Sequence, residues 1–185
     1  ETLEHIGAGR FQAALVHAGA DIHMPRRAIS EPGLALALGG VGITLEDLVG
    51  LYATLGDGGR VRPLVLQEPG AFALPRRFVR AETADRVIDI LAGSPSPAGR
   101  APAQLAQNAP SVAFKTGTSY GFRDAWSVGV SNGYAIGVWV GRPDGVPRPG
   151  ATGREAALPI LFEAFDLLGV PSDQVVRPHE EDRHG

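Results

Sequence analysis

The order of the sequence patterns predicts an α+β fold in which an antiparallel sheet is flanked by helices. Helical patterns fill the first half of the chain. An Asn-Gly turn then joins two apolar segments, at 124–131 and 134–141, and a capped helical pattern follows at 152–168. Asn-Gly between apolar segments is the strongest short-range sign of a β-hairpin. Strands that follow a block of helices indicate packed layers of helix and sheet.

Length and composition favour one domain, or part of one, with a real core. The chain has 185 residues, of which 44% are hydrophobic, and its 25 glycines and 15 prolines predict many loops. The net charge is −3 and no long run has one sign, so we expect no nucleic-acid partner. The absence of cysteine excludes disulfides and Cys-ligated zinc, and we expect no cofactor.

The first half of the chain carries three helical patterns. Residues 1–20 read as helical, with two glycines interrupting the pattern. The clearest helix is capped by Thr44, with Asp47 three residues on in an arrangement close to a capping box, and it ends at the glycine-rich turn 56–59. A third, amphipathic pattern covers 82–92.

The segments between these helices predict little regular structure. Residues 21–43 are rich in glycine and proline and read as irregular, and 61–67 is expected to form a short strand. A Pro/Ser/Gly/Ala-rich stretch at 93–111 is long for a loop in a compact domain, so we expect it to be mobile.

A strand at 112–116 and the hairpin make up the predicted sheet, which spans 112–141. A two-residue turn pairs Ser131 with Tyr134 and so sets Trp126 opposite Trp139, a pair that would fix the register. Both faces of the hairpin are apolar, which indicates that layers cover it on both sides.

The last helix is predicted at 152–168. Thr152 and Glu155 form a capping box, and Pro159 is expected to kink the helix or to delay its regular start. One face is expected to be lined by Leu161, Ala164, Phe165 and Leu168. We therefore assign 1–170 to one unit and 171–185 to a polar tail or linker.

Lys115 is the only lysine among the 17 basic residues of the chain. It lies at the end of a predicted strand and is followed by Thr-Gly-Thr-Ser. Lysine offers a compact charge on a flexible stem, and glycine lets another backbone come close. Hydroxyl donors beside a positive charge make a plausible cradle for a carboxylate. A lysine at a strand end before a polar turn is the alternative, because short motifs also match by chance.

The motif and its flanks resemble a known family. Lys-Thr-Gly-Thr is the third motif of penicillin-binding proteins and serine β-lactamases. The resemblance is closest to class A penicillin-binding proteins of the 1C type. It is carried by Phe114-Lys-Thr-Gly-Thr-Ser-Tyr-Gly-Phe-Arg-Asp-Ala-Trp126, by Tyr134-Ala-Ile-Gly-Val-Trp-Val-Gly141, by the stretch from Leu34 to Tyr52, and by Asp57-Gly-Gly59. It runs from about residue 1 to 168 and implies the C-terminal part of a transpeptidase domain.

This resemblance implies a peptidoglycan D,D-transpeptidase that works by acyl transfer. A serine, activated by a lysine, attacks the D-Ala-D-Ala carbonyl of a stem peptide, and an amine of a second stem peptide resolves the acyl-enzyme. β-Lactams would be inhibitors that trap the serine. The resemblance also implies a periplasmic site and a parent protein anchored in the inner membrane.

The resemblance assigns roles to the residues of the motif. Lys115 and the hydroxyls of Thr116 and Thr118 would hold the substrate carboxylate, and the Thr118 N–H would form half of an oxyanion hole. The strand edge that contains Gly117 and Ser119 would bind the substrate backbone as an added strand. Tyr120 is a candidate for lining the substrate groove.

Two further motifs of the family do not occur in this sequence. Ser-x-x-Lys would need a serine at Val112, and Ser-x-Asn is not present. In the family both lie upstream, so we expect the chain to begin just after the second and an upstream segment of the same domain to supply the nucleophile. On its own, the chain is expected to be inactive.

Three alternatives stay open. A related D,D-carboxypeptidase or β-lactamase would share the motif, a non-catalytic sensor or scaffold would keep it without the chemistry, and an unrelated α+β domain would carry it by chance.

Arg123 and Asp124 are either a pair on the rim of a cleft or a surface ion pair, and we favour the surface pair. The five histidines lack metal-ligand spacing, so no metal site is expected.

Overall fold

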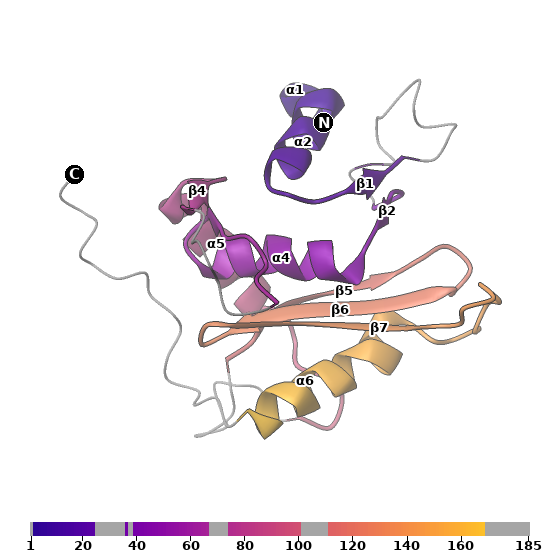
Figure 1. Ribbon diagram of the computed structural model, residues 1–185. Coiled ribbons are helices and arrows are strands. Elements are labelled where there is room, and N and C mark those ends of the chain that lie inside the picture. Colours follow the sequence, from indigo (N-terminus) through magenta and orange to yellow (C-terminus); the bar gives the residue numbers. More distant parts are fainter. Residues whose placement is uncertain (1, 25–35, 37–38, 67–73, 101–110, 169–185) are drawn as a thin grey trace.

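The structure is a computed structural model that describes residues 2–24, 36, 39–66, 74–100 and 111–168 (Figure 1). The predicted tail 171–185 and most of the predicted mobile loop 93–111 lie outside these ranges. Helices and antiparallel strands are both present, so the α+β prediction is confirmed.

The central sheet has three antiparallel strands, β5 (Ala113–Thr118), β6 (Asp124–Ser131) and β7 (Tyr134–Gly141). Their order is β5-β6-β7, so β5 is an edge strand among the described residues. Both hairpin strands have the predicted bounds. The first strand differs from the prediction, because it begins one residue later and continues through the glycine of the motif to Thr118.

The β6–β7 turn has the backbone that Asn-Gly favours. Asn132 and Gly133 both have positive φ angles, 46° and 77°, as the tight hairpin turn requires. Ser131 therefore pairs with Tyr134, and Trp126 pairs with Trp139. Their ring centroids are 6.4 Å apart with a 54° tilt, which confirms the predicted aromatic pair.

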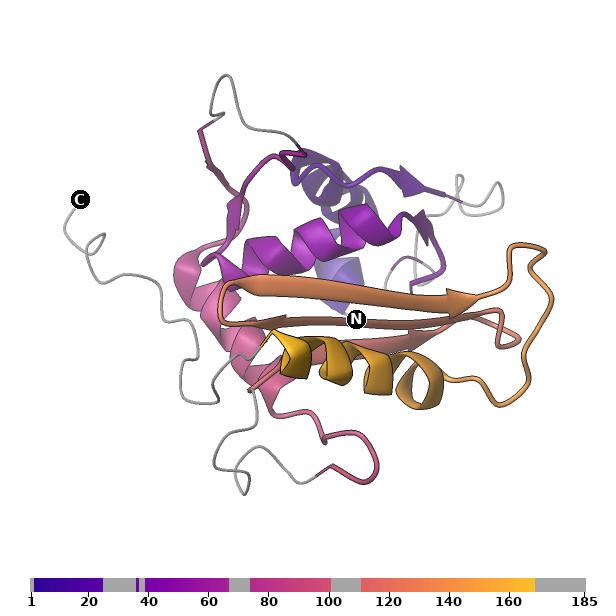
Figure 2. The ribbon, with the colours of Figure 1, turned by 60° about the horizontal axis from the view of Figure 1, so that its bottom comes forward.

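Helical layers cover both faces of this sheet, as predicted. Helix α4 (Leu45–Gly56) lies on one face and helix α6 (Leu158–Leu167) on the other (Figures 1 and 2). Two glycines allow the close packing. A Cβ at Gly137 would clash with Leu45 of α4, and a Cβ at Gly129 would lie 3.1 Å from Leu161 of α6.

The core lies between the sheet and α6. The buried cluster consists of Val112, Phe114, Leu158, Leu161, Phe162 and Phe165. Phe114 and Phe162 meet edge to face, with centroids 5.2 Å apart. The predicted face of the helix was partly wrong. Leu168 is 45% exposed because α6 ends at Leu167, and Ala164 is only half-buried.

The segment before α6 explains why the buried face of the helix lies nearer the N-terminus than predicted. Residues Gly153–Ala157 form a π-helical turn, called the π turn below, and the regular helix starts at Leu158 with Pro159 in its first turn. Pro159 predicted that the regular helix would start late, and this prediction is confirmed. The capping box is half formed, because Thr152 Oγ1 accepts from the Glu155 N–H at 3.1 Å while the Glu155 carboxylate accepts from the Thr152 hydroxyl instead of its N–H.

The N-terminal helical region is divided in two, α1 (Thr2–Ile6) and α2 (Ala8–His17). Gly7, with φ 84°, separates them, whereas Gly9 lies inside α2 and does not interrupt it. Strand β1 (Ile22–His23) then pairs with β2 (Gly42–Ile43), just before α4.

Helix α4 begins as predicted. Thr44 Oγ1 accepts from the Asp47 N–H at 3.0 Å and donates to the Asp47 carboxylate at 2.6 Å. Helix α5 (Ala81–Ala92) begins one residue before its predicted start.

The predicted strand at 61–67 was wrong in extent. Strand β3 (Arg60–Val61) has only two residues, 62–66 has no strand, and residue 67 lies outside the described ranges. Its partner β4 (Arg76–Arg77) is equally short, so the ladder ends after two pairs. Within the part of the chain that the structure describes, no helix is long and apolar enough to cross a membrane.

Candidate active site

Strand β5 presents the four motif residues alternately on the two faces of the sheet. Lys115 pairs across the sheet with Val128 and then with Gly137, which faces α4, so Lys115 and Gly117 belong to the α4 face. Thr116 and Thr118 belong to the opposite face, where α6 lies. A single ligand can therefore contact the Lys115 ammonium and both threonine hydroxyls only if it lies beside the edge of β5.

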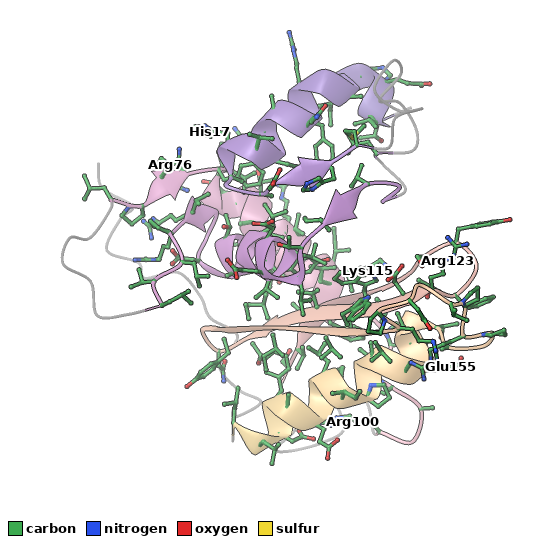
Figure 3. All side chains as sticks on the ribbon, turned by 45° about the vertical axis from the view of Figure 1, so that its right-hand side comes forward. His17, Arg76, Arg100, Lys115, Arg123 and Glu155 are labelled. Carbon is green, nitrogen blue, oxygen red and sulfur yellow. The ribbon has the colours of Figure 1, made fainter. Side chains whose placement is uncertain are left out.

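The Lys115 side chain is exposed on β5. Its Nζ donates to the Thr116 carbonyl at 2.7 Å, and it takes part in none of the ion pairs between described residues. Figure 3 shows Lys115 and Arg123 toward the end of the sheet where Glu155 and the π turn lie. The positive charge of Lys115 is thus available to an anion.

Two consecutive hydroxyl oxygens at the end of β5 each accept a hydrogen bond from a backbone N–H. Thr118 Oγ1 accepts from Gly153 at 2.9 Å, and Ser119 Oγ accepts from Asp124 at 2.8 Å. A hydroxyl that accepts through one lone pair still has its own proton to donate. Both side chains can therefore act as hydrogen-bond donors to an anion.

The turn after the motif is closed by backbone hydrogen bonds. The Ser119 N–H donates to the Asp124 carbonyl at 2.9 Å, and the Phe122 N–H donates to the Ser119 carbonyl at 3.1 Å. Tyr120, between them, is 99% exposed. Its role in lining a substrate groove stays a prediction.

Arg123 and Asp124 do not form the expected surface ion pair. The Asp124 carboxylate accepts from Trp139 Nε1 at 3.0 Å, and no ion pair of the described residues joins it to Arg123. The sequence contained a signal for this contact, since the hairpin register puts Asp124 two residues from Trp126 and so near Trp139.

Gly153 is a site residue that sequence reasoning missed. It is buried at the start of the π turn, and its N–H reaches Thr118 from 35 positions away in the sequence. The only local sign was a glycine directly after the capping Thr152. Nothing local indicates that this glycine touches the motif.

A cavity between described residues lies elsewhere. It has a volume of about 900 Å³ and lies between α4, the segment after β3 and the start of β7, and none of the motif residues lines it. The described residues also contain no group of His, Asp and Glu side chains that could hold a metal ion. Glu46 and Asp47 lie in the first turn of α4, where acidic side chains favour a helix start.

The site thus combines an exposed cation, two hydroxyls that accept hydrogen bonds from backbone N–H groups, and a strand that lies at the edge of the sheet among the described residues. Such a set can bind a carboxylate and the backbone of an extended peptide. Among the residues that the structure describes, the site contains no nucleophile with an adjacent base.

Comparison with known proteins finds a relative over most of the chain. No protein-family model matches the chain. Over 168 residues, 91% of its length, it is 38% identical to penicillin-binding protein 1C of Escherichia coli, strain K12. The chain spans about a fifth of that relative, 21% of its length. This identity supports the assignment of the chain to the penicillin-binding proteins, as part of a transpeptidase domain of the class A 1C type.

Proposed function

We propose that this chain is the carboxylate-binding and strand-binding part of a peptidoglycan D,D-transpeptidase. The observation that carries the proposal is that the sole lysine of the chain lies exposed on an edge strand whose next residues are Thr-Gly-Thr. A stem peptide that ends in D-Ala-D-Ala offers what this edge can bind, an extended backbone and a terminal carboxylate.

In this proposal the residues divide the work along the strand. Lys115, Thr116 and Thr118 attract and orient the carboxylate, while Gly117 and Ser119 belong to the edge that pairs with the peptide backbone. The Thr118 N–H donates to the oxyanion as the tetrahedral intermediate forms, an interaction that commonly contributes about 3–4 kcal/mol. Tyr120 borders the groove.

The acyl step needs groups that this sequence lacks. An upstream segment of the same domain supplies the attacking serine, its lysine base and the Ser-x-Asn motif. The serine oxygen bonds to the carbonyl carbon, D-Ala leaves with the proton, and an amine of a second stem peptide releases the acyl group. β-Lactams inhibit by the first of these steps. The parent protein works in the periplasm, held by a membrane anchor.

The test is covalent labelling. The domain that joins this chain to its upstream segment is incubated with a fluorescent penicillin, and the labelled protein is quantified on a gel. We expect an adduct that is lost when the upstream serine is replaced, and labelling at least tenfold slower in Lys115→Ala, because a charge-assisted bond to the carboxylate is removed. A folded domain without adduct would sink the proposal. Labelling that persists without the serine would show non-specific reaction.

The fate of the adduct separates the related functions. Slow release, with transfer to an added amine, supports the transpeptidase. Rapid hydrolysis points to a carboxypeptidase or a β-lactamase. A stable adduct without turnover of stem peptide points to a sensor.

A further inference from the structure

The backbone of Gly153 touches the motif strand from the α6 side. Its N–H donates to Thr118 Oγ1 at 2.9 Å. A Cβ on Gly153 would lie 3.0 Å or less from three backbone atoms, the N and O of Gly117 and the O of Trp126. Any other residue at this position would therefore push the π turn, and with it this N–H, away from β5.

The π turn that carries this N–H is held from two directions. Thr152 Oγ1 accepts from the Glu155 N–H at 3.1 Å and so fixes the turn from within. The Arg154 guanidinium donates to the carbonyls of Pro95 at 3.1 Å and Ser96 at 2.7 Å, which fixes the turn to a neighbouring loop. The direction of the Gly153 N–H is thus set by contacts that do not involve the motif.

This hydrogen bond decides how the Thr118 hydroxyl can be used. The hydroxyl has one proton and two lone pairs, and the Gly153 N–H occupies a lone pair. The proton is left for another acceptor. A donor on the oxygen also polarises the O–H and strengthens the bond that it donates. Without the Gly153 N–H, the hydroxyl is free to rotate to other partners.

We infer that Gly153 is a positioning residue of the carboxylate-binding site. It holds the Thr118 hydroxyl as an acceptor, so that the hydroxyl proton is directed to the substrate carboxylate. The inference rests on the proposed function, since the Thr118 hydroxyl matters for acylation only if it binds that carboxylate.

The experiment compares two ligands that differ only in the carboxylate. The domain with its upstream segment is treated with a penicillin or with the methyl ester of the same penicillin, and the acylation rate is followed by intact mass. Gly153→Ala is expected to slow the acid about tenfold and the ester less than twofold, the size of one lost charge-assisted hydrogen bond. Gly9→Ala is the matched control, because open space surrounds that glycine, and its rates should equal those of the wild type.

A double-mutant cycle separates positioning from a general loss of structure. Thr118→Val removes the hydroxyl and should lower the acid-to-ester ratio as Gly153→Ala does. If Gly153 acts through that hydroxyl, the double variant is no slower than Thr118→Val alone. Effects that multiply, or equal slowing of acid and ester by Gly153→Ala, would overturn the inference.

Two further outcomes are covered. If Gly153→Ala does not fold, hydrogen exchange at the Gly153 amide tests the inference instead. Protection of this amide that is lost in Thr118→Val and kept in Thr118→Ser supports the inference. Equal protection in both variants refutes it. If the wild-type domain forms a serine adduct but the acid-to-ester ratio does not respond to Gly153, only the inference fails. If it forms none, the proposed function fails and the inference falls with it.

Discussion

The indole of Trp139 donates to the carboxylate of Asp124 at 3.0 Å, across the open end of the β6–β7 hairpin. This contact ties the first residue of β6 to β7 at the point where β6 receives the chain from the motif turn. The Asp124 N–H also donates to Ser119. One residue therefore joins the hairpin register to the turn that follows Lys115.

Replacing Asp124 should loosen this end of the sheet. We expect Asp124→Ala to lower the free energy of unfolding by about 1–2 kcal/mol, since a hydrogen bond to a charged group is lost at a partly exposed site. Asp124→Asn keeps an acceptor oxygen and should cost about half as much. Urea unfolding followed by tryptophan fluorescence measures both, because both tryptophans of the chain lie in this hairpin. Equal losses in the two variants would contradict the role of the indole bond.

Gly137 should tolerate no side chain, because α4 packs directly on it. A Cβ there would lie 2.8 Å from Leu45 Cδ1 and closer still to Val49. Gly137→Ala is therefore expected to destabilise the fold by about 1–3 kcal/mol through overpacking. Gly50→Ala is the matched control on α4 itself, where no atom lies within 4 Å of an added Cβ, and it should stabilise by about 0.5–1 kcal/mol. Thermal unfolding compares them, and a stable Gly137→Ala would show that α4 is not seated on β7.

The parts of the fold that could be predicted are those encoded over short distances. Asn132-Gly133 fixes the hairpin turn, and the turn alone sets the register that pairs Trp126 with Trp139. The cap of Thr44 needs only the backbone N–H three residues on. The lysine motif could be located for the same reason, since it follows a strand pattern and precedes the hairpin.

The parts that could not be predicted depend on contacts between distant residues. The length of β3 depends on its pairing with β4, which joins Arg60 to Arg77 and Val61 to Arg76. The buried face of α6 is displaced by one turn because the π turn and Pro159 determine where the regular helix starts. The approach of Gly153 to Thr118 joins segments 35 residues apart, and no local pattern contains that information.

The pKa of Asp144 should respond to Arg142. The Arg142 side chain donates to both carboxylate oxygens, at 2.9 and 2.6 Å, and the Val146 N–H donates at 3.1 Å. These bonds, the Arg142 pair above all, hold the pKa of Asp144 below its usual 3.8. Its stabilising contribution is therefore present above pH 3.8 and is lost as the pH falls through the lower, folded-state pKa.

Titration of the Asp144 carboxyl by NMR measures this effect. In Arg142→Gln the pKa should rise toward 3.8, and high salt should raise it in the wild type, because the pair is exposed. Arg148→Gln is the control, because among the described residues the Asp144 carboxylate pairs with Arg142, while Arg148 donates its backbone N–H to the Phe122 carbonyl. A wild-type pKa at or above 3.8 would refute the pairing.

Two serines of β6 offer a matched pair of buried hydroxyls with opposite expectations. Ser127 is fully buried, and its Oγ has no hydrogen-bond partner among the described residues. Ser131 is also buried, and its hydroxyl donates to the Ser111 carbonyl at 2.9 Å. An unpaired buried hydroxyl costs about 1–3 kcal/mol, whereas a paired one contributes about 1 kcal/mol.

Ser127→Ala should therefore raise the free energy of unfolding by about 1 kcal/mol, while Ser131→Ala should lower it by a similar amount. Both changes remove one oxygen from the same strand, so differences in helix or strand propensity largely cancel. Urea unfolding under one set of conditions compares them directly. A destabilised Ser127→Ala would contradict this prediction.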